Sequence, residues 1–166
     1  MREVDPALLA RIDIRAALDT ETAGPRRDLL PIQVGDLAAR AKLDEVAAII
    51  ATRAQEGRVG IQPAPVLAAG KWRHGRRPAA ALALPERTLY RAATNLLGDG
   101  LADEREKTDH ATFVKAPVQN GDDFIIVTDL ANFYSSIQID RLAETLLSRT
   151  GEWSTVTWLR DFLHAI

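Results

Sequence analysis

The chain contains no cysteine and only three histidines among its 166 residues. Without cysteine it cannot form disulfide bonds or thiolate metal sites, and the histidines do not have the spacing of zinc ligands. No apolar run approaches the ~18 residues of a membrane-spanning helix, and the N-terminal residues do not form the apolar core of a signal peptide. We therefore expect an intracellular protein without a membrane segment, most simply one of the bacterial cytoplasm.

Positive charge is not in excess either, because the formal net charge is −2. Proteins that bind nucleic acid through bulk electrostatics normally have a basic balance. The basic residues are nevertheless unevenly distributed, and five of them lie within seven positions: Lys71, Arg73, His74, Arg76 and Arg77. A local patch of this kind can contact phosphates whatever the total charge.

The composition is that of a soluble globular protein, with a hydrophobic fraction of 46 % and a charged fraction of 27 %. A chain of this length can bury a real core as one domain. Nothing in the sequence requires two domains.

Helices are predicted in the N-terminal third. Asp5-Pro6 is a helix-start signal, and the apolar positions predict a helix over residues 6–19, followed by a loop over 20–31. A second helix is predicted over 36–56, with Gly57 just past its end. The buried stripe of this second helix would be Leu37, Ala41, Leu43, Val46, Ala47 and Ile50.

Residues 58–85 have a different character, since Pro63 and Pro65 limit helix formation. An extended segment over 66–72, a turn at His74-Gly75 and a strand over 79–84 predict a β-hairpin. The basic patch would then form the tip of this hairpin. A charged tip that is merely solvated remains an open alternative.

A further helix is predicted over residues 85–97, ended by Gly98. Arg87 and Arg91 lie four positions apart and therefore share one side of it. They would either line a nucleic-acid groove or form an ordinary solvated face. The buried face would consist of Leu89, Ala92, Ala93 and Leu96.

The central feature of the sequence is FIIVTDLANFYSSI, residues 124–137. Its apolar run over 124–127 is too short for a helix and predicts a buried strand. Asp129 would then lie at the C-terminal end of that strand. A carboxylate in such a place is costly to bury unless a partner compensates its charge, and Mg²⁺ bound together with substrate phosphates suits that geometry.

Two helices are expected after this stretch. Asp140 is the predicted N-cap of the first, which Thr150-Gly151 would end, and its apolar residues are Leu142, Leu146 and Leu147. The second has apolar residues at helical spacing: Trp153, Val156, Leu159, Phe162, Leu163 and Ile166. Because the apolar pattern is unfinished at the last residue, we expect that the chain was cut there or that this helix docks on something further.

An aspartate after an apolar strand, with Phe-Tyr four and five places later, resembles the first palm motif of reverse transcriptases, especially the bacterial retron-like and phage-defence enzymes. The resemblance implies that Asp129 binds both catalytic Mg²⁺ ions and that the carbonyl of Leu130 completes the coordination. It also implies that backbone amides near Asn132 and Phe133 face the incoming triphosphate. Tyr134 would lie under the sugar and exclude a ribose 2′-hydroxyl.

The preceding segment, RRPAAALALPERTLYRAATNLL, is similar to a basic segment, an arginine-containing strand and a helix at this distance before the palm motif of the family. The resemblance implies that the triphosphate or the nucleic acid is contacted by basic residues here. The candidates are Lys71, Arg73, Arg76 and Arg77. The motif does not decide between Arg76 and Arg77.

The second acidic motif of such polymerases is not found after Ile137. Two-metal nucleotidyl transfer needs at least two carboxylate-bearing segments to hold metal ions ~4 Å apart, and the family supplies the second from a later aromatic-x-Asp-Asp hairpin. Gly121-Asp122-Asp123 spells a viral polymerase triplet but precedes the motif, so we interpret it as turn chemistry. The resemblance therefore implies an N-terminal fragment that is inactive by itself and lacks the remaining palm and thumb.

The expected fold class is α+β, with N-terminal helices, a fingers-type β-hairpin and the beginning of a polymerase palm. The regions would be helical over 1–57, fingers-like over 58–116 and the start of the palm over 117–166. The implied cofactor is Mg²⁺, as two ions in the complete enzyme. The implied partners are an RNA template, a DNA primer and dNTPs.

Three other interpretations remain open. The chain could be a non-catalytic module with a polymerase-like fold that binds nucleic acid or a partner protein. Asp129 could be the nucleophile of an unrelated phosphotransferase, although such enzymes usually have a second aspartate where this chain has Ala131. Finally, Phe133 and Tyr134 could be ordinary core residues, with Asp129 capping a turn.

Overall fold

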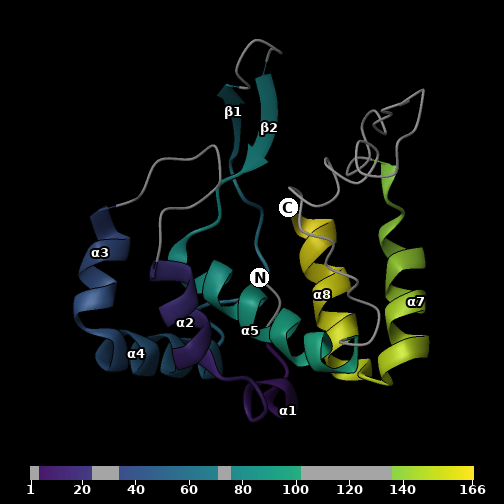
Figure 1. Ribbon diagram of the computed structural model, residues 1–166, viewed down its shortest axis with the longest axis horizontal. Helices are drawn as coiled ribbons and strands as arrows, with labels where there is room; N and C mark the ends of the chain where they lie inside the picture. The colour runs from purple at the N-terminus through teal and green to yellow at the C-terminus, as the bar shows by residue number, and fades with distance from the viewer. Residues whose placement is uncertain (1–3, 24–33, 71–75, 102–135) are drawn as a thin grey trace, which may run out of the picture.

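The computed structural model describes residues 4–23, 34–70, 76–101 and 136–166. Within these ranges the chain is mostly helical, with one two-stranded antiparallel sheet, in agreement with the expected α+β class. Helices form a broad base and the β-hairpin projects from it (Figure 1). The elements are α1 (Pro6–Leu9), α2 (Ile14–Thr22), α3 (Val34–Ala41), α4 (Leu43–Gln55), β1 (Val66–Gly70), β2 (Arg76–Ala80), α5 (Leu84–Gly100), α7 (Ile139–Thr150) and α8 (Trp153–Ala165).

The first predicted helix is divided in two. Asp5 caps α1 as expected, because its side chain accepts a hydrogen bond from the backbone N–H of Ala7 at 2.9 Å. The prediction of one helix over 6–19 was wrong, since Asp13 caps a new helix by accepting from the N–H of Ala16 at 2.8 Å. A side chain that bonds the nearby backbone in this way favours a helix start over a helix interior. Because α2 runs to Thr22, the loop expected from residue 20 also begins later.

The second predicted helix is likewise two helices. The break is at Lys42, whose backbone angles are φ −134° and ψ 47°. As a result α3 buries a different face, with Asp36 and Ala39, and Leu37, which was expected to be buried, is 59 % exposed. Ala41 is exposed as well. The stripe is confirmed on α4 at Ala47 and Ile50, and Gly57 follows this helix at a positive φ of 67°, as expected.

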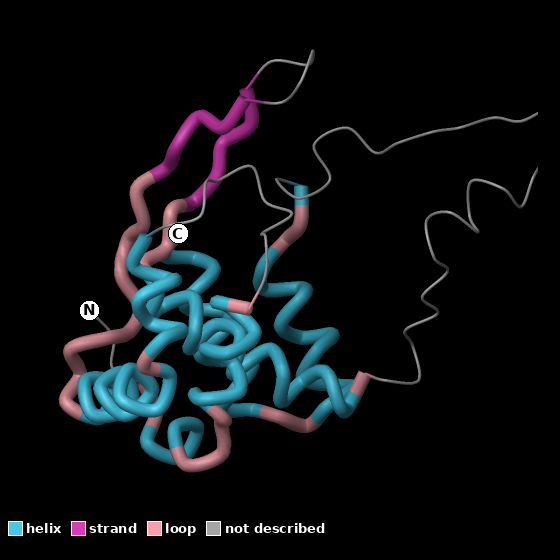
Figure 2. Tube along the Cα trace, turned by 60° about the vertical axis from the view of Figure 1, so that its left-hand side comes forward, coloured by secondary structure: helices cyan, strands magenta, loops and turns pink. Residues whose placement is uncertain are grey.

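The hairpin is confirmed, but its second strand lies earlier than residues 79–84. β1 pairs antiparallel with β2 from Val66 opposite Ala80 to Gly70 opposite Arg76. The next hydrogen bond runs from the N–H of Ala81 to the carbonyl of Pro65, at 2.8 Å. The strand ends there because Leu84 already begins α5, with Pro85 in the first turn. Seen from a second direction, the hairpin still projects clear of the helices (Figure 2).

Helix α5 is the centre of the fold and packs against α2, α7 and α8. Its buried side chains include the predicted Leu89, Ala92 and Ala93, together with Leu97. Ala93 has no exposed surface, and a side chain this small lets a neighbouring helix approach closely. The helix does not end at Gly98 as predicted but continues to Gly100.

Helices α7 and α8 form an antiparallel pair (Figure 1). Gln138, and not Asp140, is the N-cap of α7; Asp140 lies in the first turn, where the helix dipole favours a negative charge. Gly151 ends the helix as predicted, with φ 67° and its N–H bonded to the carbonyl of Leu147 at 2.9 Å. Trp153 was expected on the buried face of α8 but is 68 % exposed.

Three aromatic rings join α8 to α5. Phe162 stacks on Tyr90 of α5 with ring centroids 5.3 Å apart and on Trp158 with centroids 5.2 Å apart. Val156, Leu159 and Phe162 are buried, as the helical spacing predicted. Residues from both ends of the chain, such as Val4 and Phe162, belong to the same hydrophobic cluster.

Polar surface contacts hold the residues that flank α1 to the start of α8. Arg11 donates two hydrogen bonds to the carboxylate of Glu152, at 2.6 and 2.7 Å, and Ser154 donates to Asp5. The hydrogen bonds from Arg11 and Ser154 lower the pKa of Glu152 and of Asp5, respectively. A carboxylate with a lowered folded-state pKa stabilises the fold above its ordinary pKa, and this contribution is lost as the pH falls through the lowered value.

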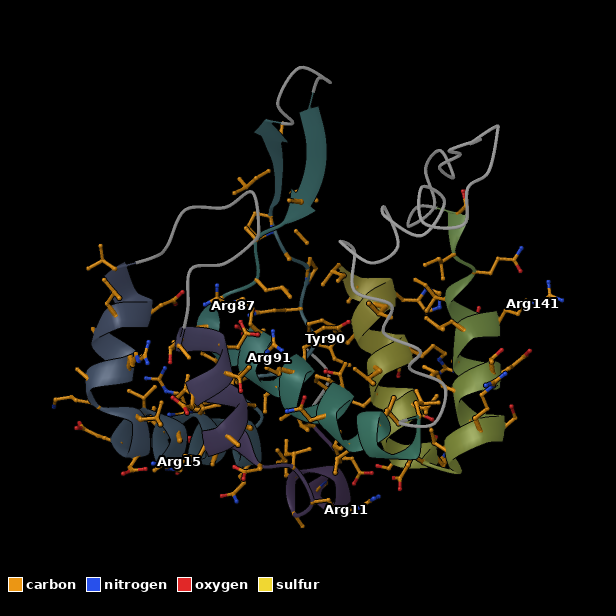
Figure 3. All side chains as sticks on the ribbon, in the orientation of Figure 1. Arg11, Arg15, Arg87, Tyr90, Arg91 and Arg141 are labelled. Carbon is orange, nitrogen blue, oxygen red and sulfur yellow. The ribbon has the colours of Figure 1, made fainter. Side chains whose placement is uncertain are left out.

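A network of charges fixes α2 and α3 on α5. The guanidinium of Arg87 lies 2.8 Å from Asp36 of α3 and 3.9 Å from Glu21 of α2. Arg91, one turn further along α5, also pairs with Glu21, and Figure 3 shows both arginines on the same side of α5. The side chains of Arg87 and Asp36 are only 11 % and 6 % exposed. Buried charges are tolerated only when they are paired, so this contact restricts how the three helices can pack.

No helix in the described ranges is both long enough and apolar enough to cross a membrane.

We predict that Arg87→Met lowers the free energy of unfolding by about 3 kcal/mol, because it removes the buried cation that contacts the carboxylate of Asp36 at 2.8 Å. Arg91→Met is the matched control, since it also removes a partner of Glu21 but from a side chain that is 41 % exposed. Its cost should be about 1 kcal/mol or less. Urea unfolding followed by circular dichroism measures both losses. Equal losses would contradict the role assigned to the buried pair.

Two glycines give an opposite pair of predictions. A Cβ at Gly151 or at Gly35 meets nothing within 4 Å, but only Gly151 has a positive φ. Gly151→Ala should therefore destabilise by about 1 kcal/mol. Gly35→Ala, within α3, should stabilise by about 0.5 kcal/mol because alanine loses less chain entropy in a helix. Thermal melting of both variants tests the signs, and a shift in the same direction would show that the positive φ of Gly151 does not decide the effect.

Candidate functional site

The predicted catalytic motif lies outside the described residues except for its last two, Ser136 and Ile137. This applies to Asp129 as the candidate metal ligand, to the carbonyl of Leu130, and to the substrate-binding candidates Asn132, Phe133 and Tyr134. It applies equally to the strand expected before them and to the turn at Gly121-Asp122-Asp123. Their roles stay predictions.

The basic hairpin residues are partly described. Lys71 and Arg73 lie outside the described residues. Arg76 and Arg77 belong to β2, opposite Gly70 and Ala69. In an antiparallel ladder these pairs are the ones furthest from the base of the hairpin, where Ala81 bonds to Pro65. The backbone thus places Arg76 and Arg77 toward the distal end of the projecting ribbon.

The last two residues of the motif, Ser136 and Ile137, lead into α7, whose N-terminal end is on the same side of the molecule as this hairpin. Ser136 is exposed and precedes α7, and the N-terminal end of α7 lies near the top in Figure 1, as the hairpin does. An open depression of about 420 Å³ occurs there. It is lined by Ser136, Ile137, Gln138, Arg141, Leu142 and Thr145. Arg141 points outward from α7 in Figure 3, which gives this region an exposed cation.

The burial of Arg87 excludes this residue from the nucleic-acid groove considered from the sequence, whereas for Arg91, which is 41 % exposed, that alternative stays a prediction. Arg87 is nearly buried and bonds to Asp36, while Arg91 pairs with Glu21. Arg87 is not part of an ordinary solvated face either, because its side chain is only 11 % exposed. These two side chains hold α5 against α3 and α2, and the base of the hairpin adjoins the start of α5.

A buried carboxylate that the sequence did not reveal lies at the start of α5. Glu86 is 6 % exposed, and its Oε1 accepts a hydrogen bond from the side-chain nitrogen of Gln62 at 2.7 Å. Its Oε2 is buried and has no hydrogen-bond partner among the described residues. An acidic side chain in the first turn of a helix is ordinarily solvated, and the helix dipole stabilises its negative charge. No sequence pattern near Glu86 predicts its contact with Gln62, which lies 24 residues earlier in the chain.

Glu86 lines a cavity of about 320 Å³ between the base of the hairpin and α5. The rest of the lining is mostly apolar and comes from the residues just before β1 and just after β2: Pro63, Ala64, Pro65, Ala81, Leu82 and Ala83, with Gln62 as the other polar residue. A concave apolar site with a few polar groups is the usual form of a small-molecule site.

Among the described residues, no group of three or more histidine, aspartate or glutamate side chains is placed to hold a metal ion. One histidine and one aspartate do lie close together near the C-terminal end: Nε2 of His164 is 3.2 Å from the carboxylate of Asp140. Both side chains are exposed, on α8 and α7 respectively, so we interpret them as an ordinary surface pair. The Mg²⁺ site implied by the sequence would depend on Asp129, in the undescribed segment.

Comparison with protein-family models, with curated proteins and with solved structures finds no match for this chain.

Proposed function

We propose that this chain is the fingers region and the beginning of the palm of a cytoplasmic RNA-directed DNA polymerase of the bacterial reverse-transcriptase type. The observation that carries the proposal is the stretch FIIVTDLANFYSSI, in which an aspartate follows an apolar run and two aromatic residues follow the aspartate at fixed spacing. The polymerase copies an RNA template by adding dNTPs to a DNA primer.

The order of the described elements supports this proposal. A projecting hairpin with a basic sequence comes first, the long helix α5 follows it, and α7 comes directly after the motif. The hairpin and the N-terminal end of α7 lie on the same side of the molecule (Figure 1). A motif that ends at Ile137 therefore ends on the side toward which the basic strand β2 projects. This is the arrangement needed if a triphosphate is to be held between basic residues and a catalytic carboxylate.

The motif's residues have separate roles in this proposal. Two Mg²⁺ ions would activate the primer 3′-hydroxyl and stabilise the leaving pyrophosphate. Asp129 and the carbonyl of Leu130 would hold them, as a set of oxygen ligands that Mg²⁺ prefers. Amides near Asn132 and Phe133 would bind the triphosphate, and the ring of Tyr134 would exclude the ribose 2′-hydroxyl.

A second acidic segment is also required, because two ions ~4 Å apart need more than one carboxylate-bearing segment. No aromatic-x-Asp-Asp sequence occurs between Ile137 and Ile166. The 166-residue chain alone should therefore not extend a primer. The same observation favours, as a second candidate, a binding module that retains the polymerase-like fold and holds nucleic acid without catalysis.

We predict that Asp129→Ala abolishes DNA synthesis by the full-length polymerase, because the ions lose their shared carboxylate. Primer extension on an RNA template with dNTPs and Mg²⁺ measures the effect. Asp122→Ala is the matched control, since Asp122 belongs to the predicted turn seven residues earlier and its loss should leave synthesis near the wild-type rate. Near wild-type incorporation by Asp129→Ala would refute the metal role.

Tyr134→Ala should relax discrimination against ribonucleotides, because the ring that would contact the 2′-hydroxyl is removed. Tyr134→Phe keeps the ring and should keep the discrimination. The measurement is the ratio of kcat/KM for a dNTP to that for the corresponding rNTP in the full-length enzyme. An unchanged ratio in Tyr134→Ala would count against the sugar gate while leaving the role of Asp129 standing.

A further inference from the structure

The cavity under the hairpin contains an unused acceptor. Glu86 is more than nine-tenths buried and lines the cavity, yet one of its two carboxylate oxygens has no partner among the described residues. An ionised carboxylate only accepts hydrogen bonds, and leaving a buried acceptor unsatisfied is costly. The N-terminal end of α5 favours a negative charge at this position. The site is therefore built for a ligand that donates hydrogen bonds.

Gln62 gives the carboxylate a defined orientation. Its side-chain nitrogen donates to Oε1 at 2.7 Å, which restrains rotation of the carboxylate. Residues 63–65, which follow Gln62, and residues 81–83, which precede Glu86, form the walls of the cavity. The hydrogen bond between Ala81 and Pro65 closes the two walls into one frame. The position of this acceptor oxygen is therefore restrained, unlike that of a carboxylate on a freely rotating surface side chain.

The walls select the shape of the ligand. Pro63, Pro65 and Leu82 offer apolar surface, which favours a ring over a small hydrated cation such as an ammonium group. The volume of about 320 Å³ lies at the lower limit of ordinary ligand sites, which begin at about 300 Å³. It suits one heterocyclic base, with any sugar or phosphate extending outward. Arg76 and Arg77, on the strand that leaves this cavity, provide positive charge toward the distal end of the hairpin.

The four common bases differ in what they present to a carboxylate. Guanine offers two adjacent donors, N1–H and the N2 amino group, along its Watson–Crick edge. Adenine and cytosine place a ring-nitrogen acceptor beside their amino group, and uracil places its single donor between two acceptors. Proteins read unpaired bases along this edge, by hydrogen bonds combined with contact to the ring faces. Guanine is therefore the base whose edge matches Glu86.

We propose that the cavity between the hairpin base and α5 is a guanine-binding site in which the carboxylate of Glu86 accepts from N1–H and N2–H of the base, one donor at the unused Oε2 and the other at the second lone pair of Oε1, which also accepts from Gln62. The guanine can come from a free nucleotide or from an unpaired position in a nucleic-acid strand, since both present the same edge. The proposal does not use Asp129 or Mg²⁺. Its failure and the failure of the polymerase assignment are therefore distinguishable.

The test is isothermal titration calorimetry of the 166-residue chain, without metal ions, with GMP, IMP and AMP. GMP should bind about tenfold or more tightly than IMP, which lacks the N2 amino group, and than AMP, which faces the carboxylate with an acceptor. A second arm compares a short single-stranded oligonucleotide containing one guanine with the same strand containing adenine. A guanine preference in either arm supports the site and identifies the source of the base.

Glu86→Gln should remove the preference for GMP over AMP, because an amide replaces one acceptor oxygen with a donor. Glu144→Gln, on the exposed side of α7, is the matched control and should bind as the wild type does. Leu82→Trp should abolish binding by filling the cavity while leaving Glu86 in place. Circular dichroism and urea unfolding confirm that each variant is folded. Equal affinity for GMP and AMP in the wild type, or unchanged affinity for GMP in folded Glu86→Gln, would overturn the proposal.

Discussion

The arrangement of the described helices depends on one buried cation, the guanidinium of Arg87. It contacts Asp36 of α3 at 2.8 Å and Glu21 of α2 at 3.9 Å. A charge removed from water must keep its partners, so these helices cannot shift along α5 without a large electrostatic cost. The C-terminal end of α2 is held in addition by Arg40 of α3, which donates to the carbonyl of Ala23 at 2.8 Å. The apolar core determines that the helices pack, and these polar contacts determine in which register.

The same turn of α5 serves the hairpin. Glu86 and Arg87 are neighbours in the sequence, but Glu86 meets Gln62 beneath the hairpin while Arg87 meets the carboxylates of α2 and α3. One helical turn therefore connects the helical base to the projecting strands. A two-stranded ribbon is only marginally stable by itself, and Val66 and Leu67 of β1 are 61 % and 46 % exposed. Its direction must be set at its base, by α5 and by the bond between Ala81 and Pro65.

Features with a local cause could be predicted from the sequence. The cap at Asp5, the glycines at the ends of α4 and α7, the hairpin and the buried faces of α5 and α8 all follow from patterns within a few residues. The divisions at Asp13 and Lys42 could not be predicted in this way. Both interrupt apolar patterns that would also fit a continuous helix, and a pattern alone does not tell which of two starts the chain uses.

Contacts between distant segments could not be predicted at all. Arg91 meets Glu21 across 70 positions and Gln62 meets Glu86 across 24. Arg87 and Arg91 have the spacing of a shared helix face, but spacing does not reveal which carboxylates cover that face. The candidate catalytic residues, led by Asp129 and Tyr134, were predicted from a motif, and they remain predictions because the structure describes neither of them.

The core's composition has a consequence for biosynthesis. Val4 and Leu8 pack in the same cluster as Val156 and Phe162, so this hydrophobic cluster depends on pairings between residues that lie far apart in the sequence. Such non-local pairings slow folding, because a long loop must close before they form. During translation, helices near the N-terminus emerge long before α8. Until Phe162 leaves the ribosome, the apolar side of α5 lacks its aromatic cover, and exposed apolar surface of this kind favours aggregation.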